Sequence, residues 1–218
     1  MTTVLAARPE PLSAYGADDF ARDFAATAAQ LADLEAFRVL VEQTNAVMNL
    51  VGPATLPAFW SRHALDSAQL LKLAPDALTW ADLGAGAGFP GVVLAILLKG
   101  KAGARVHLVD SLTKRCRFLE QAVAALDLPA EVHVSRAENL KIPVDIVTAR
   151  AVAPMTKLLG FARPYFALGA EGLFLKGEGA AHELAEARLA WRFEADLIPS
   201  LSDPRGQVVR IRRLARAR

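Results

Sequence analysis

The chain of 218 residues contains a single cysteine, Cys116, and only two tyrosines. One cysteine excludes an intrachain disulfide and a zinc site built from several thiolates. The apolar run VVLAILL at residues 92–98 is far shorter than the roughly 20 residues that a bilayer-spanning helix needs. The N-terminal stretch MTTVLAARPEPLSAYG lacks the charged and apolar segments of an export signal. These absences predict a cytoplasmic protein without a membrane span.

Charge is nearly balanced, with a formal net charge of +2, but it is unevenly distributed. The last fourteen residues, RGQVVRIRRLARAR, carry six arginines and no acidic residue. An arginine cluster of this kind indicates an anionic partner, most often a phosphate backbone. A solvated chain end is the alternative interpretation.

Two regions with different patterns follow a predicted N-terminal tail at residues 1–17. Residues 18–76 show helical periodicity, with Asp18 and Asp19 predicted to cap a helix in which Phe20, Phe24, Ala28 and Leu31 share one face. The stretch NLVGPATLP interrupts this region before a second helix carrying FWSRHALDSAQLLKL. Residues 77–218 are predicted to form an α/β domain with a basic C-terminal tail, to which residues 18–76 add a helical unit.

The second region alternates short β-rich segments with helical ones. Its predicted strands are LTWADL, ARVHLVD, AEVHVS, VDIVTA and GLFLKG, and their alternation with helices predicts a parallel sheet covered on both faces. FEADLIPSLSDPRGQVVRIRRL reads as an antiparallel hairpin that closes the sheet. In the helix after the second strand, Leu112, Cys116, Leu119, Val123 and Leu126 form one apolar stripe, which predicts a packing role for Cys116.

The stretch DLGAGAGFPG at residues 82–91 places several glycines directly after the first strand. Gly84, Gly86 and Gly88 read as G-x-G-x-G, whereas Gly86, Gly88 and Gly91 satisfy the G-x-G-x-x-G dinucleotide pattern. Asp110 ends the second strand, where an acid accepts hydrogen bonds from ribose hydroxyls in either class of site. The pairing predicts an adenosine-containing ligand, and a purely structural glycine turn is the alternative.

The tyrosines argue against a nicotinamide cofactor. A small dehydrogenase needs an acid-base pair such as Tyr-x-x-x-Lys, but Tyr165 is followed at that spacing by Gly169, and Tyr15 precedes the sheet. The closing antiparallel hairpin is typical of class I methyltransferases. S-adenosylmethionine is therefore favoured.

Four segments resemble one family: RHALDS at 62–67, DLGAGAGFPG at 82–91, DSLTKRCRFLEQ at 110–121 and ARAVAP at 149–154. They resemble the bacterial 16S rRNA guanine-N7 methyltransferases, also called the glucose-inhibited division B proteins, over about residues 45–177. The resemblance implies a class I, Rossmann-like α/β fold with a mostly parallel seven-stranded sheet and an N-terminal helical cap. It also implies S-adenosylmethionine as cofactor and guanine 527 of 16S rRNA, in the small ribosomal subunit or an assembly intermediate, as substrate. We expect a monomer that needs no metal.

The cofactor site is expected from the glycine turn, the strand-end acid and the resemblance. Its predicted residues are Gly84, Gly86, Gly88, Phe89, Asp110, Ser111, Ala137, Glu138 and Arg150. Arg150 stands where methylases of exocyclic amines carry an Asn/Asp-Pro-Pro-aromatic box. Since guanine N7 has a free lone pair and loses no proton on methylation, the absence of this box fits an N7 acceptor. Arg150 is the only candidate for a catalytic residue. We expect it to hold the cofactor carboxylate or an RNA phosphate, with a structural salt bridge as the alternative.

Contacts to rRNA phosphates are predicted for basic residues on several segments. These are Arg62, His63, Lys114, Arg115, Arg117, Lys176, Arg210, Arg212 and Arg213, with solvated or packed helix faces as the alternative. His63, Asp66 and Ser67 fall on one helix and are not expected to form a hydrolase triad. His107, His133 and His182 are scattered in sequence, so no metal site is predicted.

Two other functions fit parts of the pattern. A non-catalytic module that binds S-adenosylmethionine or a nucleotide beside RNA would use the same glycine turn. A nicotinamide dehydrogenase would bind NAD instead. Cys116, which could suggest a cytosine-C5 methylase nucleophile, is assigned to packing by its place in the apolar stripe.

Overall fold

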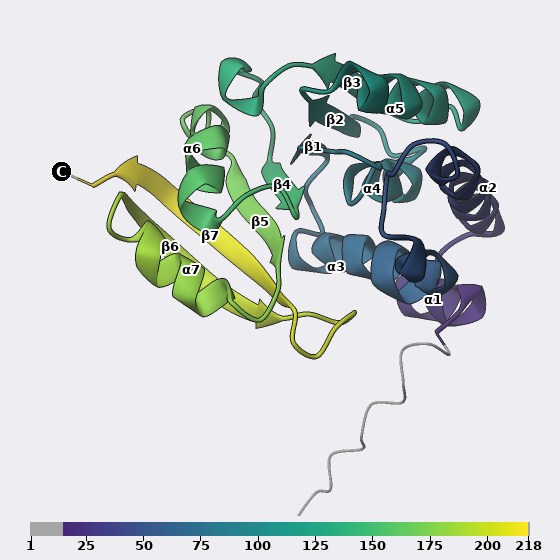
Figure 1. The fold of residues 1–218 in the computed structure, drawn as a ribbon, viewed down its shortest axis with the longest axis horizontal. Coiled ribbons are helices and arrows are strands. Elements are labelled where there is room, and N and C mark those ends of the chain that lie inside the picture. The colour runs from purple at the N-terminus through teal and green to yellow at the C-terminus, as the bar shows by residue number, and fades with distance from the viewer. Residues whose placement is uncertain (1–14, 218) are drawn as a thin grey trace, which may run out of the picture.

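A computed structural model describes residues 15–217, which form a seven-stranded sheet flanked by helices (Figure 1). The strand order is β3-β2-β1-β4-β5-β7-β6. The strands are β1 (Thr79–Leu83), β2 (Arg105–Asp110), β3 (Ala130–Val134), β4 (Ile146–Arg150), β5 (Glu171–Lys176), β6 (Trp191–Pro199) and β7 (Gln207–Arg216). The first five are mutually parallel, whereas β7 runs antiparallel between β5 and β6. The predicted fold class and closing hairpin are confirmed.

Helices cover both faces of the sheet, which explains why the central strands β1, β4 and β5 are buried along most of their length. Helices α4 (Gly91–Leu98) and α5 (Thr113–Ala125) lie on one face, and α6 (Met155–Phe166) and α7 (Ala180–Ala187) lie on the other (Figure 1). Side chains of β1 alternate between the two cores: Trp80 packs on the α4 side and Ala81 on the α6 side. Every residue of α4, GVVLAILL, is buried.

The N-terminal region is helical, as its periodicity predicts, but the first predicted helix is divided in two. It contains α1 (Ala17–Phe24), α2 (Ala28–Asn45), a 3₁₀ segment (Pro53–Ala58) and a π-helical turn (Trp60–Leu65) that continues into α3 (Asp66–Leu73). The prediction of one helix through Phe20 and Leu31 is wrong, because Thr27 starts a new helix. Its Oγ1 accepts the Gln30 amide at 3.2 Å while the Gln30 side chain accepts the Thr27 amide at 2.9 Å, a capping box.

The predicted helix cap is also corrected at the start of α1. Helix α1 begins at Ala17, within the segment predicted as a tail, and Asp18 and Asp19 lie in its first turn. The Asp19 carboxylate accepts the amide of Gly16 at 2.9 Å. An acid in the first turn stabilises the helix by binding a free amide and by opposing the positive end of the helix dipole.

The N-terminal helices share a hydrophobic core with the sheet. The ring of Phe37 in α2 lies 5.2 Å from the ring of Phe89 in the glycine turn and 6.5 Å from that of Phe118 in α5, measured between centroids. Phe20, Leu34 and Phe37 belong to the same buried cluster as α4. The boundary at residue 77 therefore separates two sequence patterns rather than two cores.

Most of the segment predicted as a basic tail is strand. Residues 207–216 form β7, in which Gln207 pairs with Lys176 and Ile211 pairs with Gly172. The three arginines of this strand for which phosphate contacts are predicted form ion pairs within the chain: Arg210 with Glu171 at 2.6 Å, Arg212 with Asp196 at 2.8 Å and Arg213 with Glu194 at 2.6 Å. Arg218 lies outside the described residues. None of the helices in residues 15–217 combines the length and apolar composition of a bilayer-crossing segment.

The shared core predicts one cooperative unfolding transition. Phe37→Ala should lower the free energy of unfolding by about 3–5 kcal/mol, because it removes a fully buried ring between α4, α5 and the glycine turn. Denaturant unfolding followed by circular dichroism and tryptophan fluorescence measures this change. Leu189→Ala, at an 86% exposed position, is the control and should change little. Separate transitions for the helical region and the sheet would contradict the single core.

Candidate functional site

Two adjoining cavities open at the carboxyl ends of the parallel strands. The smaller cavity, about 350 Å³, is lined by Asp110, Ser111, Ala137 and Glu138. The larger cavity, about 790 Å³, lies between the glycine turn, the N-terminal helices, the end of β4 and the β6–β7 loop. The walls common to both are Gly84, Arg115, Ala151 and Val152. In the strand order, β2 and β3 lie on one side of β1, and β4 and β5 lie on the other. Doubly wound sheets bind ligands at such a reversal, outside the carboxyl ends of the strands.

Close packing in the turn after β1 requires glycine at several positions. The amides of Gly84 and Ala85 both donate to the carbonyl of Val109, at 2.7 and 3.0 Å. Gly84 has a φ of +68°, and a Cβ there would lie 2.7 Å from Val152 Cγ2. Gly88 lines neither cavity, since a Cβ at this position would meet Val92 and Phe37. Glycine at position 88 is therefore explained by packing, and the ligand contact predicted for it stays a prediction.

Asp110 links the glycine turn to the start of α5. One carboxylate oxygen accepts the amide of Gly86 at 3.0 Å, and the other accepts the amide of Leu112 at 2.8 Å. Arg115 Nη1 lies 3.7 Å away. A carboxylate has about four lone-pair sites, so these bonds leave capacity for ligand hydroxyls in the smaller cavity.

Asp82, for which the sequence suggested no role, fixes α4 against β1. Its Oδ2 accepts the amide of Gly91 at 2.8 Å, and a Cβ on Gly91 would lie 2.8 Å from the same oxygen. Burial raises the pKa of Asp82 to about 7. The last glycine of the motif thus permits close contact between helix and strand.

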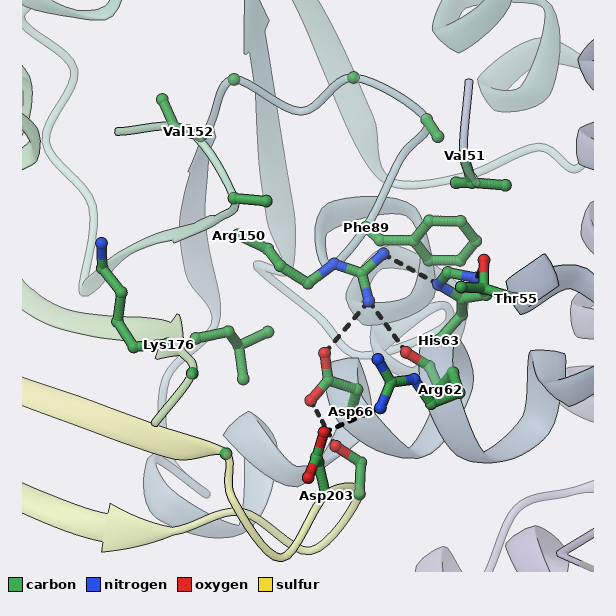
Figure 2. A pocket seen from close by; sticks show the side chains of 18 of the residues that line it. Val51, Thr55, Arg62, His63, Asp66, Phe89, Arg150, Val152, Lys176 and Asp203 are labelled. Carbon is green, nitrogen blue, oxygen red and sulfur yellow. Dashed lines mark hydrogen bonds and ion pairs between the residues drawn. The ribbon is translucent and has the colours of Figure 1, made fainter. Parts of the chain in front are cut away.

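Arg150 joins the end of β4 to the N-terminal helices (Figure 2). Its Nη1 donates to the Arg62 carbonyl at 3.0 Å and to Asp66 Oδ2 at 3.1 Å, and its Nη2 donates to His63 Nδ1 at 3.0 Å. The guanidinium carbon also lies 4.9 Å from the centroid of the Phe89 ring. The alternative predicted for Arg150, a salt bridge, is therefore present. Three of its five N–H groups make these contacts, and the side chain still lines the larger cavity.

His63 is a buried, neutral partner of Arg150. Since Nδ1 accepts from Arg150, the proton is on Nε2, which donates to Thr55 Oγ1 at 3.0 Å. Its ring stacks on Phe89 at 4.5 Å. Burial, followed by the charges of Arg150 and Arg62, lowers the pKa of His63 to about 3. The residue was predicted to contact RNA phosphate, but an uncharged buried ring is suited to hold Arg150 instead.

Neither Ser67 nor Cys116 is placed to act as a nucleophile at the site. Ser67 Oγ donates to the carbonyl of His63 at 2.6 Å rather than to its ring, so the two residues form no triad with Asp66. The Cys116 thiol is fully buried, donates to the Asp110 carbonyl at 3.3 Å and has a pKa raised by burial. It lines neither cavity, in agreement with the packing role predicted for it.

The other residues predicted to bind RNA fall into two groups. Arg62, Arg115 and Lys176 line the larger cavity. Lys176 is engaged internally, because its ammonium donates to the Ala153 carbonyl at 2.8 Å and to Glu183 at 2.7 Å. The residues that line neither cavity are Lys114, Arg117, Arg210, Arg212 and Arg213.

The β6–β7 loop forms a cavity wall that the sequence did not indicate. Ser202 Oγ donates to Asp66 Oδ1 at 2.6 Å, and the Leu201 amide donates to the Gln69 side chain at 2.8 Å. Arg62 pairs with Asp203 at 2.8 Å, and both residues are labelled in Figure 2. These contacts attach the loop to the N-terminal helices beside the larger cavity.

Curated proteins with similar sequences are rRNA methyltransferases. A family model described as rRNA small subunit methyltransferase G matches residues 30–208. Ribosomal RNA small subunit methyltransferase G of Caulobacter vibrioides (strain NA1000 / CB15N) is 65% identical over 193 residues, which cover 88% of this chain and 89% of that protein. The same enzyme of Caulobacter sp. (strain K31) is 62% identical over 209 residues, covering 96% and 95%.

Two solved structures with similar folds are of methyltransferases that have low sequence identity to this chain. An O-methyltransferase from Bacillus cereus in complex with SAH has a TM-score of 0.57 and 15% identity, covering 93% of this chain and 100% of that chain. A SAM-dependent methyltransferase from Aquifex aeolicus has a TM-score of 0.54 and 17% identity, covering 80% and 97%. These similarities support the class I methyltransferase fold.

The buried state of His63 predicts an acid-dependent loss of stability. The ordinary pKa of 6.5 falls to about 3 in the folded chain, so below pH 6.5 the unfolded chain takes up a proton that the folded chain does not. The free energy of unfolding should fall by about 2 kcal/mol from pH 7 to pH 5 through this residue alone. Urea denaturation of His63→Gln should show a correspondingly smaller fall.

His182→Gln is the matched control, because His182 is exposed on α7. This variant should lose stability with acid as the parent chain does. An equal fall between pH 7 and pH 5 in His63→Gln and the parent chain would contradict the assignment of His63 as a neutral buried ring.

Proposed function

Because the chain belongs to the rRNA small subunit methyltransferase G family, we propose that it methylates N7 of guanine 527 of 16S rRNA with S-adenosylmethionine. The observation that carries this proposal is the 65% identity to a relative of that name across 88% of the chain. The family resemblance noted in the sequence is thereby confirmed. We infer that the enzyme acts as a cytoplasmic monomer on the small subunit or an assembly intermediate.

The smaller cavity suits the adenosine part of the cofactor. Asp110 keeps acceptor capacity for ribose hydroxyls after binding two amides. Ala137 and Glu138 offer a backbone amide and a carboxylate in the same cavity, a pair that matches the acceptor and donor of the adenine edge. Gly84, without a side chain, leaves space where the two cavities meet.

The larger cavity suits the amino-acid part of the cofactor and the target base. S-adenosylmethionine, when bound, supplies an electrophilic methyl group on a sulfonium. Arg150 is held by three hydrogen bonds and retains two N–H groups, which we assign to the cofactor carboxylate. Arg62 and Arg115 are half-exposed at this cavity and are assigned to RNA phosphates.

No side chain at this site needs to remove a proton, because N7 of guanine presents a free lone pair. His63 is neutral, and both of its ring nitrogens are engaged by Arg150 and Thr55. The contribution of the protein is to place the base and exclude water. Positioning of this kind can lower a barrier by roughly 7–11 kcal/mol. A stacked guanine must first leave its stack to enter the cavity.

The glycine turn provides the test of cofactor binding. Gly84→Ala should weaken S-adenosylmethionine binding by about tenfold or more. The added methyl would collide with Val152 in the wall that the two cavities share, at a backbone conformation that favours glycine. Isothermal titration calorimetry measures the affinity. Gly100→Ala is a matched control: Gly100 also has a positive φ, +84°, but no neighbour lies within 4 Å of its Cβ position, so its affinity should be unchanged. Equal affinities in the two variants would contradict this cofactor site.

The position of the methyl group provides the test of the reaction. Small subunits from a strain lacking the protein should accept labelled methyl at one guanine. N7 methylation makes the RNA labile to borohydride and aniline, so strand scission should map to that nucleotide. Cys116→Ala should retain transfer, since the thiol only packs. Label on an exocyclic amine, a carbon or a ribose would overturn the N7 assignment, and absence of transfer would favour a non-catalytic binding module.

A further inference from the structure

A second cluster of functional side chains lies outside both cavities, on strands β2 and β3. The register places His107 opposite Glu131 and Val109 opposite His133. Because residues two apart in a strand share a face, Glu131 and His133 project on the same side of the sheet. His107 Nδ1 lies 3.0 Å from His133 Nε2, so the three side chains meet on one face.

The ligand atoms of this cluster are close enough to share one ion. The Glu131 oxygens lie 4.0 Å from His107 Nδ1 and 3.9 Å from His133 Nε2, and all three ligand atoms lie within 4.8 Å of one another. Bonds of 2.0–2.1 Å in a tetrahedral zinc site separate two nitrogens by about 3.3 Å. The observed separation of the two ring nitrogens differs from this value by only a few tenths of an ångström.

We propose that His107, Glu131 and His133 form a Zn²⁺ site. Imidazole nitrogens and a carboxylate are preferred zinc ligands, and water completes a tetrahedron. The two histidine side chains are 10% and 18% exposed, whereas that of Glu131 is 51% exposed. The imidazoles are therefore held in place, and the carboxylate is free to rotate onto the ion from the solvent side.

One neighbouring charge opposes metal binding. Arg105 Nη1 lies 3.3 Å from Glu131 Oε2, so its guanidinium competes for the carboxylate and repels a cation. Removal of this charge should tighten the site. Tighter Zn²⁺ binding after removal of the Arg105 charge would not be expected if the two histidines served packing alone.

The ion would tie the edge strand β3 to β2 beside the smaller cavity. Strand β3 has a neighbour on one side only, and Val134, next to His133, pairs with Asp110. Bound Zn²⁺ should therefore raise the temperature of unfolding, because it binds the folded chain in preference to the unfolded one. None of the three ligands lines either cavity, so this inference is independent of the methyl transfer.

Isothermal titration calorimetry tests the site. Zn²⁺ is titrated into the untagged full-length chain in the presence of a competing chelator. The chain should bind one Zn²⁺. His133→Ala and Glu131→Gln should each weaken binding by about tenfold or more, and Arg105→Ala should strengthen it. His182→Ala is the control, because His182 is 79% exposed on α7 and has only Glu186 beside it at 3.9 Å; it should bind as the parent chain does.

Two results would overturn the proposal. The first is a parent chain that binds no Zn²⁺ under these conditions. The second is binding that neither His133→Ala nor Glu131→Gln weakens, which would identify adventitious surface binding. Glu131→Gln changes a half-exposed side chain on an edge strand, so it decides the question even where His133→Ala fails to fold. Circular dichroism of each variant confirms the fold before titration.

Discussion

The buried carboxylate of Asp110 is the interaction on which the rest of the site depends. It lies at the end of β2 and binds two amides that come from different segments, Gly86 in the turn after β1 and Leu112 before α5. Its own carbonyl accepts the Ser135 amide from the end of β3 at 3.0 Å. A desolvated carboxylate is costly without such partners, so the turn, the helix start and the third strand are held in one arrangement around it.

The N-terminal helices complete the site that Asp110 organises. Arg150 ends β4, yet its three hydrogen bonds go to Arg62, His63 and Asp66, all from the segment before the sheet. The pKa of His63, lowered by burial and by Arg150 itself, keeps the imidazole neutral, so the ring accepts rather than repels the guanidinium. The helical cap is therefore a structural part of the larger cavity.

Local sequence patterns predicted most of the helices and strands. Contacts between segments distant in the sequence could not be predicted. The alternation of β-rich and helical segments identified the five parallel strands and the hairpin. The apolar stripe of α5 was predicted correctly for Cys116, Leu119 and Leu126, whereas Leu112 precedes the helix and is 52% exposed. The break at Thr27 was missed because a capping box competed with a continuing apolar face. The ion pairs of the β7 arginines could not be predicted, because the sequence does not reveal that Glu171 and Asp196 lie on neighbouring strands.

The histidines illustrate the same limit. His107 and His133 are 26 residues apart, and only the parallel register of β2 and β3 brings their rings together. The same holds for the β6–β7 loop, whose contacts with Asp66 and Gln69 span more than 130 residues. Side-chain clusters of this kind depend on the register of the sheet, which composition and spacing do not specify.

A crystal structure of the chain with S-adenosylhomocysteine tests the central claim most directly, namely that Asp110 and Gly84 shape one ligand site across two cavities. The account predicts adenine and ribose in the smaller cavity, with the ribose hydroxyls on Asp110 and the sulfur beside Gly84, and the amino-acid carboxylate at Arg150. An adenine ring found instead in the larger cavity, against His63, would contradict it.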